Sequence, residues 1–108
     1  MRRGDFVTIT IQGNYGKPHP ALVIQADPFN EHASVTVLPV TSTLVAAPLL
    51  RIPVEPDDGN GLQKRSQMMV DKATTVKREK VGSPFGHIDE DTTIEVERSL
   101  AVFLGIAK

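Results

Sequence analysis

The side chain in this sequence best suited to proton transfer is His19, which stands between Pro18 and Pro20. Both prolines restrict the backbone, and a glycine-rich loop over residues 13–18 leads up to the histidine. Imidazole takes up or releases a proton near neutral pH and is the usual general acid or base in enzymes. His19 is therefore a candidate acid–base residue, although an exposed loop histidine is the commoner interpretation of a single imidazole.

Other polar side chains could assist such a histidine. Thr41 and Ser42 are adjacent hydroxyls at the end of an expected strand, where they could donate to a phosphate or cap the turn that follows. Asp71 and Lys72 are adjacent charges, and neighbours on a strand point to opposite faces, so we expect different surroundings for the two. The basic clusters, which could line a phosphate groove or belong to the ordinary solvated surface, are Lys64-Arg65 and Lys77-Arg78 with Lys80.

The composition argues against several kinds of site. The chain has no cysteine, so it can hold neither a disulfide nor a thiolate-bound metal. The three histidines lack the spacing of metal ligands, and no catalytic triad or phosphate-binding glycine loop is present, so we expect no metal and no cofactor. A net charge of −1 is too low for a protein that grips duplex nucleic acid through its phosphates. A short single strand in a local groove remains compatible with that charge.

Length and hydropathy point to a small globular protein. The 108 residues fit a single domain over residues 1–108, and 40% hydrophobic with 23% charged residues is an ordinary globular composition. The first residues lead into a strand pattern without the apolar stretch of a signal peptide, and no apolar run is long enough to span a bilayer. We therefore expect a cytoplasmic protein that does not contact a membrane.

The elements that must position these side chains are mostly strands. Alternating β-forming residues predict a first strand over 5–12, and a compact apolar run predicts a second over 20–25. The third, over 34–41, contains Pro39, which indicates an edge strand or a bulge. We also expect strands over 49–54, 67–70 and 73–76, a break at 71–72, a helical turn over 43–47 and a hairpin loop over 57–61.

The tail has the pattern of a helix. Asp89 is a suitable acidic N-cap, and carboxylates follow it near the positive end of the helix dipole. Val96, Leu100 and Phe103 form an apolar stripe at helical spacing, and Gly105 marks the end. The whole pattern predicts a mainly β fold, a small antiparallel barrel covered by a C-terminal helix. Such barrels host many unrelated activities.

Four segments, taken in order, resemble the MazF/PemK toxin family. They are Arg3-Gly4-Asp5-Phe6, residues 19–25 (HPALVIQ), residues 37–42 (VLPVTS) and residues 100–105 (LAVFLG), and together they span nearly the whole chain. The resemblance implies a Src-homology-3-like antiparallel β-barrel of the CcdB/MazF/PemK type with a C-terminal helix. It also implies a homodimeric toxin of a type II toxin–antitoxin pair, silenced by a cognate antitoxin with a disordered acidic tail.

The activity that the resemblance implies is metal-independent cleavage of single-stranded RNA or mRNA, which inhibits translation and growth. The 2′-hydroxyl attacks the adjacent phosphate and leaves a cyclic phosphate end, a reaction that needs a base, an acid and donors for the phosphorane charge. The family's arginine and threonine positions fall at His19 and Thr41. Asp71 matches an acidic residue that PemK-like members use in proton transfer.

The chain departs from the family pattern at two basic positions. His19 replaces an arginine, and Met69 stands where PemK-like members have a basic residue. Histidine is cationic only part of the time and cannot form the forked bonds of a guanidinium group. We therefore expect His19, if the site is active, to serve as the acid–base. Positive charge and RNA contacts would then come from Lys17, Ser42 and Arg65.

Two other functions remain open. Residues 65–71 and the ending Phe103-Leu104-Gly105-Ile106 look somewhat like the CcdB branch, whose members poison DNA gyrase. That branch normally places a tryptophan before its Gly-Ile ending, whereas this chain has Leu104 and no tryptophan, so the gyrase hypothesis ranks second. A catalytically weak barrel that acts only by binding a partner is the third possibility.

Overall fold

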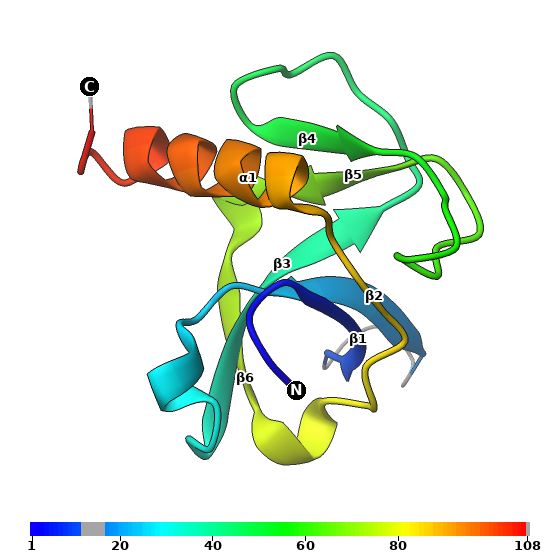
Figure 1. The fold of residues 1–108 in the computed structure, drawn as a ribbon, viewed down its shortest axis with the longest axis vertical. Helices are drawn as coiled ribbons and strands as arrows, with labels where there is room; N and C mark the ends of the chain where they lie inside the picture. Colours follow the sequence, from blue (N-terminus) through cyan, green and yellow to red (C-terminus); the bar gives the residue numbers. More distant parts are fainter. Residues whose placement is uncertain (12–16, 108) are drawn as a thin grey trace.

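The computed structural model describes residues 1–11 and 17–107 and shows a strongly curled antiparallel sheet with one helix packed against it (Figure 1). The strands are β1 (Asp5–Thr10), β2 (Pro18–Val23), β3 (Ser34–Thr41), β4 (Arg51–Val54), β5 (Ser66–Met69), β6 (Thr74–Lys77) and β7 (Gly86–His87). The helices are the 3-10 turns η1 (Asp27–Phe29), η2 (Val70–Lys72) and η3 (Arg78–Lys80), and the α-helix α1 (Glu90–Phe103). The predicted mainly β fold with a C-terminal helix is confirmed.

The strand order is β4-β5-β3-β2-β1-β7, and β6 also pairs with β3. β3 has β2 along one side, while along the other side residues 34–37 pair with β6 and residues 40–41 pair with β5. Pro39 lies between these last two runs, where neither β5 nor β6 supplies a partner in the register. Of the two alternatives predicted for Pro39, an edge strand or a bulge, the edge strand is wrong, because β3 is central. The proline lies where the partner of β3 changes.

The change of partner follows from the interruption predicted at residues 71–72, which is confirmed. There η2 separates β5 from β6, and its first residue, Val70, is fully buried. The Val70 N–H donates to the Leu50 carbonyl at 2.9 Å, which ties η2 to the approach of β4. The chain therefore leaves β3 at the end of β5. After η2 it pairs with β3 again as β6, at residues 34–37.

Side chains on opposite faces of β1, β2 and β3 enter two separate apolar clusters. Phe6 and Leu22 belong to the first cluster, together with Val96 of α1, whereas Val7 and Val23 belong to the second. This division follows from the alternation of side chains along a strand. Because both faces of these strands are buried, the polar residues at their ends project from a firmly held backbone.

The segment between β3 and β4 differs from its prediction. No helical turn forms over residues 43–47; instead, the side chain of Gln67 binds this segment. The Gln67 amide oxygen accepts from the Val45 N–H at 3.1 Å, and its amide nitrogen donates to the Val45 carbonyl at 2.9 Å. These bonds occupy both groups that Val45 would contribute to a helix. The one tight turn comes later, where Leu50 and Arg51 donate to the Ala47 carbonyl.

The helix α1 begins where the sequence predicts. Asp89 accepts a hydrogen bond from the Thr92 N–H at 2.7 Å, and hydrogen bonding by the side chain and the backbone of Thr92 lowers the pKa of Asp89 below its usual 3.8. Val96 is buried and Leu100 packs against the first cluster, but Phe103 is 46% exposed. The predicted apolar stripe therefore reaches the core at only two of its three positions.

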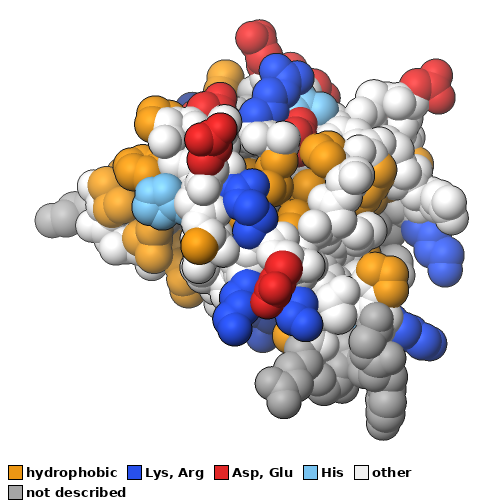
Figure 2. Space-filling model, turned by 90° about the horizontal axis from the view of Figure 1, so that it is seen from below, with side chains coloured by type: hydrophobic (Ala, Val, Ile, Leu, Met, Phe, Trp, Pro, Cys, Tyr) orange, Lys and Arg blue, Asp and Glu red, His pale blue; other side chains and the backbone are white. Residues whose placement is uncertain are grey.

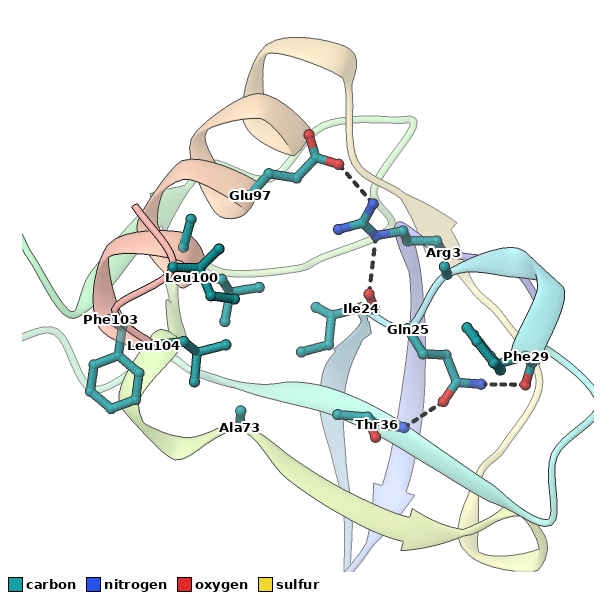
Figure 3. Close-up of a pocket in the computed structure, with 13 residues that line it drawn as sticks. Arg3, Ile24, Gln25, Phe29, Thr36, Ala73, Glu97, Leu100, Phe103 and Leu104 are labelled. Carbon is teal, nitrogen blue, oxygen red and sulfur yellow. Dashed lines mark hydrogen bonds and ion pairs between the residues drawn. The ribbon is translucent and has the colours of Figure 1, made fainter. Parts of the chain in front are cut away.

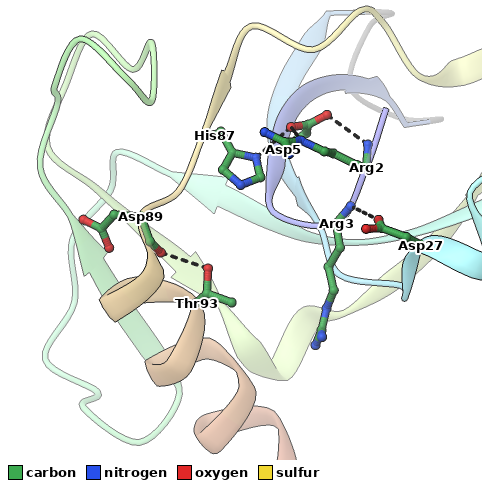
Figure 4. A network of polar contacts seen from close by, with 7 residues as sticks. All are labelled: Arg2, Arg3, Asp5, Asp27, His87, Asp89 and Thr93. Atoms are coloured by element: carbon green, nitrogen blue, oxygen red, sulfur yellow. Dashed lines mark hydrogen bonds and ion pairs between the residues drawn. The ribbon is translucent and has the colours of Figure 1, made fainter.

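Polar contacts connect the first residues of the chain with β7 and α1, and we call this cluster the polar junction (Figure 4). The Asp5 carboxylate, on β1, lies 2.8 Å from Nδ1 of His87 on β7. Gly4 has φ +88°, and a Cβ there would lie 2.9 Å from the His87 ring. Arg3 extends from the same junction, and its guanidinium donates to Glu97 of α1 at 2.7 Å. The Arg3-Gly4-Asp5 segment thus joins β1, β7 and α1.

Asp89→Ala removes the N-cap of α1, so the free energy of unfolding at pH 7 should fall by about 0.5–2 kcal/mol. Because folding lowers the carboxyl pKa, this contribution is present at neutral pH and is lost as the pH falls below the usual value of 3.8. Urea unfolding at a series of pH values measures both effects. Asp89→Asn is the control, since it keeps a capping oxygen but does not titrate. Equal stability of wild type and Asp89→Ala at pH 7 would contradict the prediction.

Candidate active site

An open cavity of about 930 Å³ lies where β2 begins and β3 ends, and we call it the cleft. Its wall includes three of the predicted site residues, His19, Thr41 and Ser42. Lys64 and Phe85 come to the same wall from distant parts of the sequence. The structure therefore brings together half of the predicted site and adds residues that the sequence analysis had not assigned to it.

A smaller cavity of about 360 Å³ shares a wall with the cleft. His19 and Thr41 line both cavities, and Met69 and Lys72 line only the smaller one. The histidine and threonine thus occupy the boundary between two hollows. A strand of nucleic acid laid across that boundary would pass both side chains.

The strand register explains why His19 and Thr41 meet. On β2 and β3, Ala21 pairs with Pro39 in antiparallel register, and continuing that register by two residues places His19 opposite Thr41. On its other side His19 pairs with Ile9 of β1. The second strand begins two residues earlier than predicted, so His19 lies inside a strand rather than at its junction with a loop.

The ring of His19 has an unpaired nitrogen. Its Nε2 atom is buried and has no hydrogen-bond partner within residues 1–11 and 17–107. A buried polar atom without a partner is costly, and native structures keep few of them. Because His19 lines both cavities, this atom is a candidate to bind a group that a ligand supplies.

Asp71 also has a buried oxygen, Oδ1, without a hydrogen-bond partner in the described part of the chain. It lies on η2 between Met69 and Lys72, which both contribute to the smaller cavity. Asp71 itself is not among the residues that line the two cavities. The structure therefore brings Asp71 to the neighbourhood of His19 without placing it on the cleft wall.

Of the two roles that the sequence left open for Thr41, the structure shows the capping of the turn. Its Oγ1 accepts a hydrogen bond from the Thr43 N–H at 3.0 Å, which caps the bend after β3. A hydroxyl that accepts one bond still has its own hydrogen to donate. That hydrogen, and the exposed hydroxyl of Ser42 beside it, remain available at the cleft.

The basic side chains are distributed differently from the prediction. Arg65 lies 2.5 Å from Glu55 in an exposed ion pair and is not among the residues of the cleft wall, whereas its neighbour Lys64 is. Neighbours on an extended chain point in opposite directions, and the sequence pattern did not show which of the two faces inward. Lys17 is exposed directly before β2. The predicted glycine-rich loop falls largely on residues 12–16, which lie outside the described residues.

One residue of the second basic cluster, Arg78, stabilises the fold, while Lys77 and Lys80 are exposed. The Arg78 guanidinium donates to the backbone carbonyls of Asn30 and His32, which fastens η3 to the chain before β3. Neither Arg78 nor its neighbours Lys77 and Lys80 line the cleft or the smaller cavity. On the face shown in Figure 2, basic side chains are scattered and mixed with acidic ones rather than gathered in one patch. Binding of nucleic acid at that face by charge alone is not favoured.

An apolar groove of about 700 Å³ lies between α1 and η1 (Figure 3). Its charged residues, Arg3 and Glu97, are paired with each other. Phe29, Phe103 and Leu104 line it and are 51%, 46% and 63% exposed. Exposed apolar side chains gathered at one place are typical of a surface that binds another protein.

Two further observations concern the described part of the chain, residues 1–11 and 17–107. It contains no group of three or more His, Asp or Glu side chains arranged to hold a metal ion. No helix in it has the length and apolar character needed to cross a membrane.

Comparison with known proteins gives a consistent result. The family model for the PemK-like, MazF-like toxin of type II toxin–antitoxin systems matches residues 2–104. A probable endoribonuclease MazF from Mycolicibacterium smegmatis is 48% identical over 108 residues, which covers 99% of each chain. These matches lie in the MazF/PemK branch and do not favour the gyrase-poison alternative.

Solved structures show the same fold. Mycobacterium tuberculosis toxin MazF-mt6 is 20% identical and superposes with a TM-score of 0.80, covering 94% of this chain and 96% of its own. An endoribonuclease from a Mycobacterial species, solved with its cognate antitoxin, is 22% identical with a TM-score of 0.81 and covers 100% and 98%. By its family match and its 48% identical relative, the chain belongs to the PemK-like, MazF-like family of toxins of type II toxin–antitoxin systems.

Proposed function

We propose that this protein is the toxin of a type II toxin–antitoxin pair and that it acts as an endoribonuclease on single-stranded RNA. The observation that carries the proposal is the position of His19 beside Thr41 at a cleft large enough for a nucleotide, with an Nε2 atom that has no hydrogen-bond partner in the described part of the chain. The relative that is 48% identical, a probable endoribonuclease, supports the same reaction.

The reaction that fits this site is an internal transfer at phosphorus. The ribose 2′-oxygen forms a bond to the adjacent phosphorus while the bond to the 5′-oxygen breaks, leaving a 2′,3′-cyclic phosphate and a 5′-hydroxyl end. We assign the Nε2 of His19 as the base that takes the 2′-hydroxyl proton, and the imidazolium so formed as the acid that gives a proton to the departing 5′-oxygen. The hydroxyls of Thr41 and Ser42 would donate to the oxygens on which negative charge develops.

The remaining site residues take supporting roles in this proposal. Asp71 is the second candidate for proton transfer, because one of its oxygens is also unpartnered and buried close to the smaller cavity. Lys17 would contact RNA at the start of β2. We replace Arg65 with Lys64 as the cation of the cleft, because Arg65 is already paired with Glu55.

The apolar groove beside α1 supports the binding of protein partners. We propose that the chain forms a homodimer. We also propose that a cognate antitoxin binds it, since similar folds are solved as a Mycobacterial complex with its cognate antitoxin and as the MazE–MazF complex of Deinococcus radiodurans. A disordered acidic antitoxin tail would fold as it binds and would cover the cleft in which RNA binds. We place the protein in the cytoplasm, where it would meet mRNA.

The direct test is incubation of the protein with mixed-sequence single-stranded RNA in EDTA. We expect cleavage to continue, because the assigned steps use only side chains of this protein, and the new ends should be cyclic phosphate and 5′-hydroxyl. Mapping of the ends also identifies the cleavage sequence. Intact RNA at high protein concentration, across varied sequences, would reject the proposed activity, and a supercoiling assay would then test gyrase poisoning.

His19→Ala should lower kcat by about 10²–10⁴-fold, because it removes the general base. Single-turnover cleavage of a labelled RNA measures the effect. His32→Ala is the matched control, since His32 is exposed and lines neither the cleft nor the smaller cavity. If His19→Ala cleaves at the wild-type rate, the proton-transfer role passes to Asp71.

Lys64→Ala and Arg65→Ala distinguish the two neighbouring cations. Loss of one phosphate contact should make the slope of log K against log salt concentration shallower by about 0.7 for a single strand. We expect this change in Lys64→Ala and not in Arg65→Ala. Fluorescence anisotropy with a 2′-O-methyl RNA, which binds but cannot be cut, provides the measurement. A shallower slope in Arg65→Ala and an unchanged slope in Lys64→Ala would show that Arg65, and not Lys64, contacts the RNA.

A further inference from the structure

We propose that Phe85 is a stacking platform for a nucleobase of the bound RNA. The proposal rests on the ribonuclease function above and adds a base-binding subsite to the same cleft. Phe85 lies in the segment between η3 and β7, 38% exposed, and its side chain contributes to the cleft wall that also contains His19. A base stacked there would belong to a nucleotide close to the cleaved phosphate.

The ring of Phe85 is supported from behind. Its centroid lies 6.1 Å from that of Phe6, with an angle of 23° between the two planes, in a stacked arrangement. Phe6 is fully buried in the first apolar cluster. Phe85 is therefore partly exposed at the cleft, while its stacking on Phe6 anchors it to the core.

The backbone around Phe85 is fixed as well. The Phe85 N–H donates to the Phe6 carbonyl at 2.9 Å. Gly61, with φ +69°, allows the neighbouring loop to come so close that a Cβ there would lie 2.5 Å from the Phe85 carbonyl oxygen. A Cβ on Gly86 would lie 2.0 Å from the Asn60 carbonyl oxygen. Two glycines thus bring this loop and the Phe85 segment into direct contact, and a ring held in place loses little entropy when a ligand stacks on it.

The surroundings of Phe85 favour a nucleobase over an apolar partner. Lys64 and the polar side chains of Gln63, Ser42 and Thr8 line the same cleft. An aromatic ring beside a cation in a groove is the pattern by which proteins hold single-stranded nucleic acid, since every base has a π-face and every nucleotide a phosphate. The exposed rings of Phe29 and Phe103, in contrast, lie in the apolar groove beside α1.

The absence of tryptophan from this sequence allows a direct test with Phe85→Trp, whose single indole reports on the cleft. The probe is a 2′-O-methyl oligonucleotide with the cleavage sequence mapped for the wild type. We expect the tryptophan emission to be quenched as the oligonucleotide saturates the protein, because a stacked base contacts the indole. Phe29→Trp is the matched control, and its emission should not change.

Affinity gives a second readout. Phe85→Leu keeps an apolar contact with Phe6 but loses the π-face, so binding of the same oligonucleotide should weaken about 5- to 150-fold. Phe85→Tyr should bind as the wild type does. Thermal unfolding of each variant separates lost stacking from lost folding, and the emission of Phe85→Trp keeps the test decisive if Phe85→Leu does not fold.

The outcomes separate this inference from the function on which it rests. Wild-type cleavage together with unquenched emission in Phe85→Trp, or with unchanged affinity in a folded Phe85→Leu, would overturn the stacking platform alone. Failure of the wild type to cleave any RNA would overturn the ribonuclease function, and the subsite with it.

Discussion

The antiparallel register of β2 against β3 is the constraint on which the candidate site depends. The last pairing of the two strands is Ala21 with Pro39, and its register, continued by two residues, brings His19 to Thr41, which lines the same two cavities. A shift of one residue would turn every side chain of β2 to the other face of the sheet. Such a shift would exchange the faces of Leu22 and Val23, which belong to different apolar clusters, and would disrupt the packing of both. The two clusters that stabilise the fold therefore also maintain the geometry of the cleft.

A few specific contacts hold the segments that surround the cleft. Gln67 pairs with Thr41 across β5 and β3, and its side chain also binds the backbone of Val45. The bend after Thr41 is thereby bound to β5, the same strand that pairs with Thr41. On the opposite wall, the close approach at Gly61 and Gly86 sets the position of Phe85. The cleft is therefore assembled from segments that lie far apart in the sequence.

In the proposed function, His19 stands where the resemblance to the family places an arginine, and this difference would change the chemistry of the site. A guanidinium group stays charged and mainly stabilises negative charge, whereas an imidazole can also exchange a proton. The unpartnered Nε2 of His19 fits the second role, and the hydroxyls of Thr41 and Ser42 with the cation of Lys64 fit the first. In this proposal, His19 transfers the proton, while the hydroxyls and Lys64 stabilise the negative charge that an arginine would otherwise stabilise.

The sequence by itself determined the elements whose signals are local. It predicted the third strand at its observed bounds, the break at η2 and the Asp89 cap of α1, because alternation, turn residues and capping act within a few positions. It also identified His19, Thr41 and Ser42, which the structure brings together at the cleft. Only the tertiary structure decided the contacts between distant segments. It showed that Pro39 lies at a change of partner, that Gln67 prevents a helical turn, that Lys64 rather than Arg65 faces the cleft, and that Phe85 contributes to its wall. Each of these depends on which residues lie beside one another after folding, and spacing along the chain does not contain that information.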